Sequence, residues 1–162
     1  MKIIVAPDKF KGSLTSFEAC DAFLKGLKSK AEMEVKSFPM ADGGDGFAAV
    51  MKYYYHTATI SCDTVDPLGR HIQARYEWDE TNRTAIIEMA VASGLVLLKE
   101  SERDPLQTSS QGTGLMIRHA LNNGADRIIL GLGGSATNDA GMGILAAMGF
   151  SFLNEKGEEL RA

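Results

Sequence analysis

The sequence predicts an α/β fold: a parallel sheet of the Rossmann-like or flavodoxin-like kind with helices, plus a β-rich antiparallel segment. Two observations lead to this fold class. A short apolar run is followed by a turn rich in glycine or aspartate and then by a helical pattern, and this order recurs along the chain. Between these units, residues 57–78 alternate between apolar and polar side chains, as antiparallel strands do.

The first unit opens the chain. A continuous apolar run at Lys2–Ala6 ends at Pro7, which favours a buried strand. Thr15 and Glu18 have the spacing of a capping box, in which each side chain bonds the backbone amide of the other, so a helix is expected there. Helical spacing places four apolar side chains on its inward face: Cys20, Phe23, Leu24 and Leu27.

The second unit repeats this order. A short strand is predicted at Glu34–Phe38, and the sequence PMADGGDG of Pro39–Gly46 forms a turn before the next helix. Asp and Gly are common turn residues, so the turn has a purely structural interpretation. Carboxylates at the carboxyl end of a strand would also suit Mg²⁺ or a substrate hydroxyl. We interpret Asp42 as functional on this basis.

The middle of the chain is predicted to be antiparallel. The sequence turns at Asp66–Gly69, and the alternation that follows places His71 on the exposed face. A third strand at Thr84–Glu88 leads into a short helical or turn segment. The residues Thr108–Gly114 then form a turn rich in hydroxyls and glycine, for which helix capping and ligand contact are both open.

The third unit contains the most informative turn, within the sequence RIILGLGGSATNDAGMGILAAM that begins at Arg127. Ile128–Leu130 is predicted to be a buried strand that the following glycines end. Glycines allow positive φ angles and let a ligand approach the backbone. We expect the next helix to begin near Thr137 or Asn138 and to point unpaired amide groups at an anion.

Two glycines of this helix start support a close approach, and an aspartate beside them has two possible roles. Gly141 and Gly143 would fall in the first helical turns, where each costs about 1 kcal/mol relative to Ala. A sequence with a purely structural role would avoid them. Asp139 gains stability as a cap in a first helical turn, but a metal-binding or catalytic role beside phosphates is the preferred interpretation.

Composition excludes several classes of function. The net charge is −4 and the pI is about 5.4, which argues against nucleic acid as the main partner. No apolar stretch is long enough to span a membrane, and the N-terminal apolar run is too short for a signal peptide, so a cytoplasmic protein without a membrane partner is expected. Cys20 and Cys62 are isolated and are predicted to be reduced thiols in the core.

Five motifs together are specific. APDKFKGSLTS, MADGGDG, DPLGR, AIIEMAVASGL and GLGGSATNDAGMGILAAMG occur in the order and at the separations found in the type I glycerate kinase family, which the chain resembles along essentially its whole length. The resemblance implies transfer of a phosphoryl group from ATP to a hydroxyl of D-glycerate, with Mg²⁺ and a two-lobed α/β fold. It also implies that the chain corresponds to the N-terminal portion of a longer protein.

The resemblance divides the chain into three segments. Residues 1–56 form a first α/β segment, residues 57–110 a β-rich segment of the second lobe, and residues 111–162 an α/β segment with the phosphate turn and a terminal hairpin. A homodimer is a further expectation.

The resemblance also suggests roles for individual residues. Asp42 is the expected base for the glycerate hydroxyl, and Asp8 competes for that role. Lys9 is expected to act in catalysis, where it would neutralise the substrate carboxylate or the transferred phosphoryl group. The expected substrate-binding residues are Lys11, Ser13, Gly43 and Gly44. The expected ATP-binding residues are Gly133, Gly134, Ser135, Thr137 and Asn138, and the expected Mg²⁺ ligand is Asp139.

Two rival interpretations remain. Gly131–Ala136 also satisfies the G-x-G-x-x-A pattern of a turn that binds NAD. That pattern needs an acidic residue about 20 positions further on, and Glu155 lies there, but inside a predicted hairpin. The second rival is a non-catalytic fragment that binds phosphate.

Overall fold

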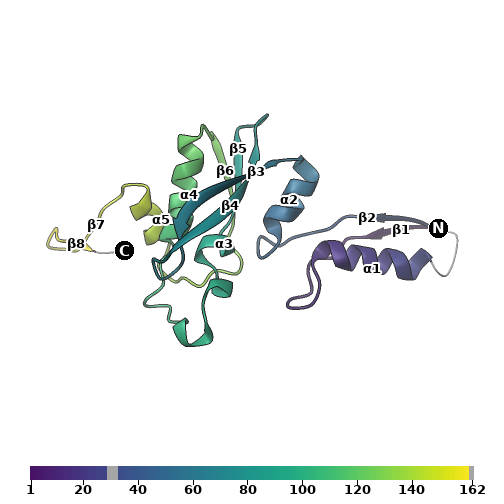
Figure 1. Ribbon diagram of the computed structural model, residues 1–162, viewed down its shortest axis with the longest axis horizontal. Helices are drawn as coiled ribbons and strands as arrows, with labels where there is room; N and C mark the ends of the chain where they lie inside the picture. The colour runs from purple at the N-terminus through teal and green to yellow at the C-terminus, as the bar shows by residue number, and fades with distance from the viewer. Residues whose placement is uncertain (29–32, 161–162) are drawn as a thin grey trace.

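The hydrophobic patterns give a mixed α/β structure with the elements close to their predicted positions (Figure 1). The computed structural model describes residues 1–28 and 33–160. The strands are β1 (Lys2–Val5), β2 (Glu34–Ser37), β3 (Ala58–Val65), β4 (His71–Asp79), β5 (Thr84–Glu88), β6 (Arg127–Gly131), β7 (Phe152–Leu153) and β8 (Glu159–Leu160). The helices are α1 (Ser16–Lys28), α2 (Phe47–Tyr55), α3 (Ala90–Ser93), α4 (Gln111–Asn122) and α5 (Met142–Ala147), with 3₁₀ turns η1 (Leu95–Leu97) and η2 (Glu100–Glu102).

The main sheet has the order β3-β4-β5-β6. The pairs β3–β4 and β4–β5 are antiparallel, as the alternating pattern predicted, whereas β5 and β6 are parallel. Every residue of β5 is buried, because α4 packs on one face of the sheet and α2 on the other. The core on the α4 side consists of Cys62, Ala74, Tyr76, Ala85, Ile87, Ala92, Met116, Ile117, Ala120 and Ala125.

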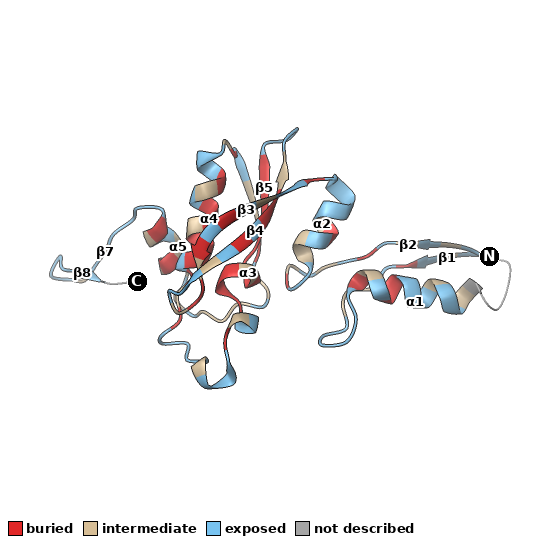
Figure 2. Ribbon diagram, viewed as in Figure 1, coloured by how far each residue is buried: buried red, intermediate tan, exposed pale blue. Residues whose placement is uncertain are grey.

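A separate two-stranded parallel sheet, β1–β2, projects with α1 away from the main sheet (Figure 1). The prediction that Lys2–Ala6 is a buried strand is wrong, since Val5 is buried but Ile4 is 72% exposed. β1 and β2 pair with no other described strand, so the apolar run has few neighbours. For the same reason Phe23, predicted to face inward, is 48% exposed. Figure 2 shows that much of β1, β2 and α1 is exposed, whereas β5 is buried.

The third unit differs from its prediction in two ways. Ile128–Leu130 is half-buried, because β6 is the edge strand of the main sheet. The following helix, α5, begins at Met142, several residues later than expected. Gly141 is the residue before this helix rather than part of its first turn, and its φ of +78° is a left-handed conformation that favours glycine.

Other predictions concern single features. The terminal hairpin is confirmed as β7–β8, and Cys20 and Cys62 are both buried and free. Strands from the second and third predicted segments share the main sheet, while the division of the chain into three segments stays a prediction. Across residues 1–28 and 33–160, no helix has both the length and the apolar character needed to cross a membrane.

Candidate functional site

Two glycine-rich turns pack against each other, backbone to backbone: residues 39–46, before α2, and residues 131–139, after β6. The Gly133 amide donates to the Gly43 carbonyl over 2.8 Å. A Cβ atom on Gly133 would lie 2.4 Å from the Gly44 Cα atom, and one on Gly131 would lie 2.8 Å from the Gly43 oxygen. The close approach expected at this turn therefore exists, but the approaching group is the other turn.

An ion pair joins the loop after β1 to the first of these turns. Lys9 Nζ donates to Asp42 Oδ1 over 3.0 Å, and Asp8 Oδ2 is 3.8 Å from the same nitrogen. Asp42 Oδ1 also accepts from the Gly44 amide over 2.9 Å. These bonds lower the pKa of Asp42, chiefly through Lys9, and the bond to Asp42 raises the pKa of Lys9. The Lys9 side chain is 12% exposed and that of Asp42 is 64% exposed, so the carboxylate is accessible.

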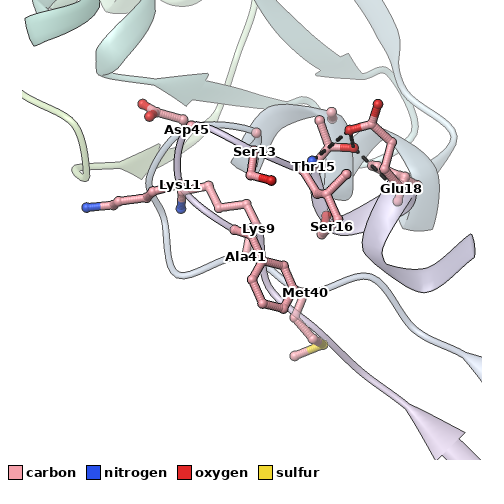
Figure 3. Close-up of a pocket in the computed structure, with 15 residues that line it drawn as sticks. Lys9, Lys11, Ser13, Thr15, Ser16, Glu18, Met40, Ala41 and Asp45 are labelled. Carbon is pink, nitrogen blue, oxygen red and sulfur yellow. Dashed lines mark hydrogen bonds between the residues drawn. The ribbon is translucent and has the colours of Figure 1, made fainter. Parts of the chain in front are cut away.

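The loop after β1 forms one wall of a cavity of about 310 Å³. Phe10 and Leu14 exchange backbone bonds of 2.8 and 3.0 Å, which close the loop tightly. Lys11 and Ser13 lie between them, are exposed, and line the cavity. Figure 3 shows the side chains that surround it. Apolar side chains and the carboxylates of Glu18 and Asp45 complete the lining, so the cavity combines cationic, anionic and hydroxyl groups.

Asp45 connects this cavity to the second glycine turn. It lines the cavity, and its Oδ1 atom would lie 2.6 Å from a Cβ atom on Gly134. Asp45 is exposed, and in the described part of the chain its carboxylate accepts no hydrogen bond. The predicted substrate-binding loop and the predicted phosphate turn therefore meet at one place.

Some of the amide groups of the second turn donate hydrogen bonds to other groups of the protein. Gly133 donates to Gly43, Ala136 to the Ser93 carbonyl, and Thr137 to Ser135 Oγ. Among residues 1–28 and 33–160, the amides of Gly134 and Ser135 donate to no protein acceptor. The hydroxyls of Ser135 and Thr137 lie 2.9 Å apart, and Asn138 beside them is exposed. The open amides are therefore in the turn itself.

The start of α5, expected to carry open amides, is closed. Asp139 Oδ2 accepts from the Ser110 amide, the Ser110 hydroxyl and the Gly143 amide at 2.8, 2.7 and 3.1 Å. Oδ1 accepts from the Gly141 amide, and the Ile144 amide donates to Ser110 Oγ, each at 3.1 Å. Burial opposes ionisation of Asp139, but the bonds from Ser110 and the glycines outweigh it and lower the pKa. The carboxylate caps α5 and joins it to the start of α4.

The turn rich in hydroxyls also makes internal contacts. Thr108 Oγ1 donates to the Ala136 carbonyl over 2.8 Å, and the hydroxyls of Thr113 and Ser93 lie 2.7 Å apart in the core. Together with Ser110, these contacts hold the second glycine turn against α4. The structure therefore shows a structural use for this segment.

Glu88 was not assigned a role from the sequence. It is 7% exposed, at the end of β5, and its two carboxylate oxygens accept from the amides of Gly46 and Ala48 over 3.2 and 3.1 Å. Gly46 precedes the first residue of α2 and has no side chain that can cap this helix. A helix that starts after a glycine has no capping side chain at that position, so another residue must accept hydrogen bonds from its first amides. The glycine before α2 is therefore the feature of the sequence that could have predicted a capping acid elsewhere in the chain.

Two further points bear on cofactors. Within the described residues, no group of three or more His, Cys, Asp or Glu side chains is arranged to hold a metal ion. Glu155, the acidic residue considered for NAD binding, lies in the turn of the antiparallel β7–β8 hairpin and not at the end of a parallel strand.

The fold and the site define an α/β protein in which a glycine-rich turn adjoins a small cavity, and Lys9, which lines this cavity, is paired with Asp42. The model of the Glycerate kinase family matches residues 3–162. The chain belongs to this family, in agreement with the resemblance seen in its motifs.

Individual relatives agree with this assignment. The chain is 43% identical over 159 residues to the glycerate kinase of Bacillus cereus, with 98% of the chain covered. It is 42% identical over 161 residues to the glycerate 2-kinase of Escherichia coli K12, with 99% covered. A crystal structure described as glycerate kinase 2 from Salmonella typhimurium LT2 matches 98% of the chain with a TM-score of 0.77 and 40% identity. The chain spans 42% of the length of the two sequence relatives and 43% of the chain in that crystal structure.

Proposed function

We propose that the protein transfers the γ-phosphoryl group of ATP to a hydroxyl of D-glycerate and so forms a phosphoglycerate. The observation that carries this proposal is the junction of the two glycine turns, which places the Lys9–Asp42 pair and the cavity next to the open amides of Gly134 and Ser135. Phosphoryl transfer depends mainly on positioning and charge neutralisation, and this junction supplies groups for both.

The cavity is the proposed site for glycerate. Lys11 makes no hydrogen bond or ion pair to another described residue, so its charge is available for the substrate carboxylate. The Ser13 hydroxyl is positioned to bind a second polar group of the substrate. Gly43 and Gly44 act through their backbone, because they place the turn that carries Asp42 beside the cavity.

The second glycine turn is the proposed site for the phosphates of ATP. The amides of Gly134 and Ser135 donate to the phosphate oxygens, and the hydroxyls of Ser135 and Thr137 add further donors. Gly133 contributes by its contact with Gly43, which fixes the turn. Asn138, exposed at the same turn, orients the phosphates.

Asp42 is the proposed base. As the substrate oxygen forms its bond to the γ-phosphorus and the bond to the β-phosphate oxygen breaks, the hydroxyl proton passes to the Asp42 carboxylate. Lys9 holds this carboxylate in place and compensates the negative charge near the transferred group. Asp8, whose Oδ1 atom accepts from the Lys9 amide over 2.6 Å, is the competing candidate.

Mg²⁺ is expected with ATP, and ions of this kind are held by the phosphates and one or two carboxylates. Asp139, the ligand predicted from the sequence, already accepts four hydrogen bonds. Asp45 fits this role better, because it is exposed, accepts no bond from the described residues, and adjoins Gly134. The metal would neutralise charge on the phosphates.

Calorimetry and an enzyme assay test this function. We expect ADP with Mg²⁺ to bind and NAD⁺ not to bind, and binding of NAD⁺ alone would contradict the proposal. A coupled assay with ATP and D-glycerate, run on this chain and on a full-length protein that contains it, compares catalysis by the two forms. Absence of turnover in the full-length protein would refute the kinase activity, whereas turnover in the longer form alone would show that this chain is inactive by itself.

The cellular setting is also part of the proposal. ATP and glycerate are small soluble metabolites, so we propose a cytoplasmic protein, which fractionation of cells would test. A homodimer is proposed as well, and light scattering after size-exclusion chromatography measures the mass directly.

A further inference from the structure

Glu88 lies where the two glycine turns meet the main sheet. It is the last residue of β5, and in the parallel pairing of β5 with β6 it is opposite Gly131, the first residue of the second glycine turn. Its side chain points to the face of the sheet on which α2 packs, since its carboxylate contacts the start of α2. Glu88 therefore belongs to the same strand pair as the proposed phosphate turn.

The contacts of Glu88 reach the other turn. The Gly46 amide is 3.2 Å from one oxygen and the Ala48 amide is 3.1 Å from the other. Gly46 has a φ of +89°, and no side chain of the first turn of α2 caps the helix. A carboxylate at this end of a helix satisfies unpaired amides and interacts favourably with the helix dipole. Glu88 thus supplies, from 42 residues further along the chain, the cap that α2 lacks.

The position of this helix start decides where the ion pair lies. Phe47, the first residue of α2, packs so closely on Gly131 that a Cβ atom there would lie 2.5 Å from its ring. Asp42 and Asp45 precede this point by a few residues of a glycine-containing turn. A shift of the α2 start would therefore move Asp42 and its partner Lys9 relative to the second glycine turn.

We propose that Glu88 is a positioning residue, which fixes the start of α2 and so sets the separation between the Lys9–Asp42 pair and the phosphate turn. The catalytic part of this inference rests on the proposed kinase function. The structural part, that Glu88 fixes the turn of residues 39–46, stands on the hydrogen bonds alone.

Glu77 provides a matched control. It is an acidic residue with the same 7% exposure and lies on the neighbouring strand, where its carboxylate accepts from Thr57 and Thr59 over 2.9 and 2.7 Å and is 3.6 Å from Lys52 Nζ. Replacing Glu77 therefore removes a buried, hydrogen-bonded acid beside α2 but no contact with the glycine turns.

The experiment compares Glu88→Ala, Glu88→Gln and Glu77→Ala in the full-length protein. Hydrogen–deuterium exchange of peptides that contain Gly46 and Ala48 is measured by mass spectrometry, and glycerate phosphorylation by steady-state kinetics. For Glu88→Ala we expect these amides to exchange about tenfold faster, because a charge-assisted bond to each is lost. We expect kcat to fall about 10- to 100-fold, because catalytic groups are misplaced, with each KM within about twofold of wild type.

The controls separate positioning from general stability. Glu88→Gln keeps the shape and one good acceptor, so its kcat should lie between those of wild type and Glu88→Ala. Glu77→Ala should leave both kcat and the exchange of the Gly46–Ala48 peptides unchanged. An equal fall in kcat for Glu77→Ala would overturn the proposal.

Two other outcomes are decisive as well. If Glu88→Ala does not fold, Glu88→Gln alone is compared, and wild-type exchange and kcat in that variant would overturn the positioning role. If the wild-type protein does not phosphorylate glycerate, the proposed function fails, and the exchange data still decide whether Glu88 fixes the turn: faster exchange supports it and unchanged exchange refutes it.

Discussion

At the scale of single residues, the Lys9–Asp42 pair holds two opposite charges together at the proposed site. Asp42 has its pKa lowered below the ordinary 3.8, and Lys9 has its pKa raised above the ordinary 10.5, each chiefly through the bond between them. The depressed carboxyl pKa means that Asp42 loses its charge only as the pH falls below 3.8. The pair is therefore ionised across the neutral range, so Asp42 is unprotonated there, as the proposed role of base requires.

The first prediction concerns Asp42→Asn in the full-length protein. The amide cannot take up the hydroxyl proton, so kcat should fall about 100-fold, within the usual range for a general base. Because Asp42 titrates below pH 3.8, we expect wild-type kcat to show no acid limb from this group near neutral pH. Steady-state kinetics over a pH series measures both effects. Asp21→Asn, at an exposed aspartate of α1, is the control, and full activity of Asp42→Asn would shift the role of base to Asp8.

The second prediction concerns Asp139→Asn. The amide accepts at only one of the two oxygen positions, so its NH2 group faces either the Gly141 donor or the Ser110 and Gly143 donors, and the free energy of unfolding should fall by about 1–3 kcal/mol. The folded-state pKa is depressed, so the carboxylate contributes fully above the ordinary 3.8 and loses this contribution as the pH falls through its folded value. Urea denaturation at neutral pH and below pH 3.8 should therefore show a smaller difference between variant and wild type at the lower pH.

The same variant distinguishes a cap from a metal ligand. If Asp139 acts as the cap of α5, the Mg²⁺ concentration that gives half-maximal activity should not change, whereas a large increase would identify Asp139 as a ligand. Asn138→Ala, which removes an exposed side chain from the same turn, should leave the unfolding free energy within about 0.5 kcal/mol of wild type.

At the scale of elements, the contact between the two glycine turns has little room for a side chain. We predict that Gly133→Ala destabilises the protein by about 1–3 kcal/mol, because its Cβ atom would lie 2.4 Å from the Gly44 backbone. For Gly26→Ala, in α1, the added Cβ atom would lie within 4 Å of no atom of the described residues outside the helix backbone, and the variant should stabilise the protein by about 0.5–1 kcal/mol. Denaturant titration compares the two, and an unchanged stability in Gly133→Ala would show that the turns do not pack in this way.

The elements that the sequence predicted best are those fixed by local chemistry. The capping box of α1 is present, with the Thr15 amide 2.8 Å from Glu18 Oε2, because it needs only residues three apart. The alternation of residues 57–78 likewise requires only a sheet with one polar face. The start of α5 was misplaced, because Asp139 bonds to Ser110, a partner 29 residues away that no local pattern reveals.

The site shows the same division. The family motifs pointed to Asp42, Lys9 and the second glycine turn as parts of one site. The structure brings these residues together. The sequence did not show that Gly131 and Gly133 contact a second turn rather than a ligand, or that Glu88 caps α2. Both depend on tertiary contacts between segments 40 or more residues apart.

At the scale of the whole molecule, the two sheets differ in burial. β5 is buried throughout and pairs with a strand on each side, whereas β1 and β2 pair with each other, and Ile4 is 72% exposed. An isolated pair of strands has little stability of its own. We therefore predict that amides of β1 and β2 in this chain exchange with deuterium well before those of β5. Equal protection of both sheets would mean that another surface covers β1 and β2.

The closed loop between Phe10 and Leu14 bears on the thermodynamics of ligand capture. Its two reciprocal backbone bonds restrict the main chain around Lys11 and Ser13 before any ligand arrives. Ordering one flexible residue costs about 1–2 kcal/mol, and here much of that loss of freedom has already occurred during folding. At the proposed glycerate site a small carboxylate would therefore need few contacts, and loosening the loop would weaken the affinity of this site without removing any contacting atom.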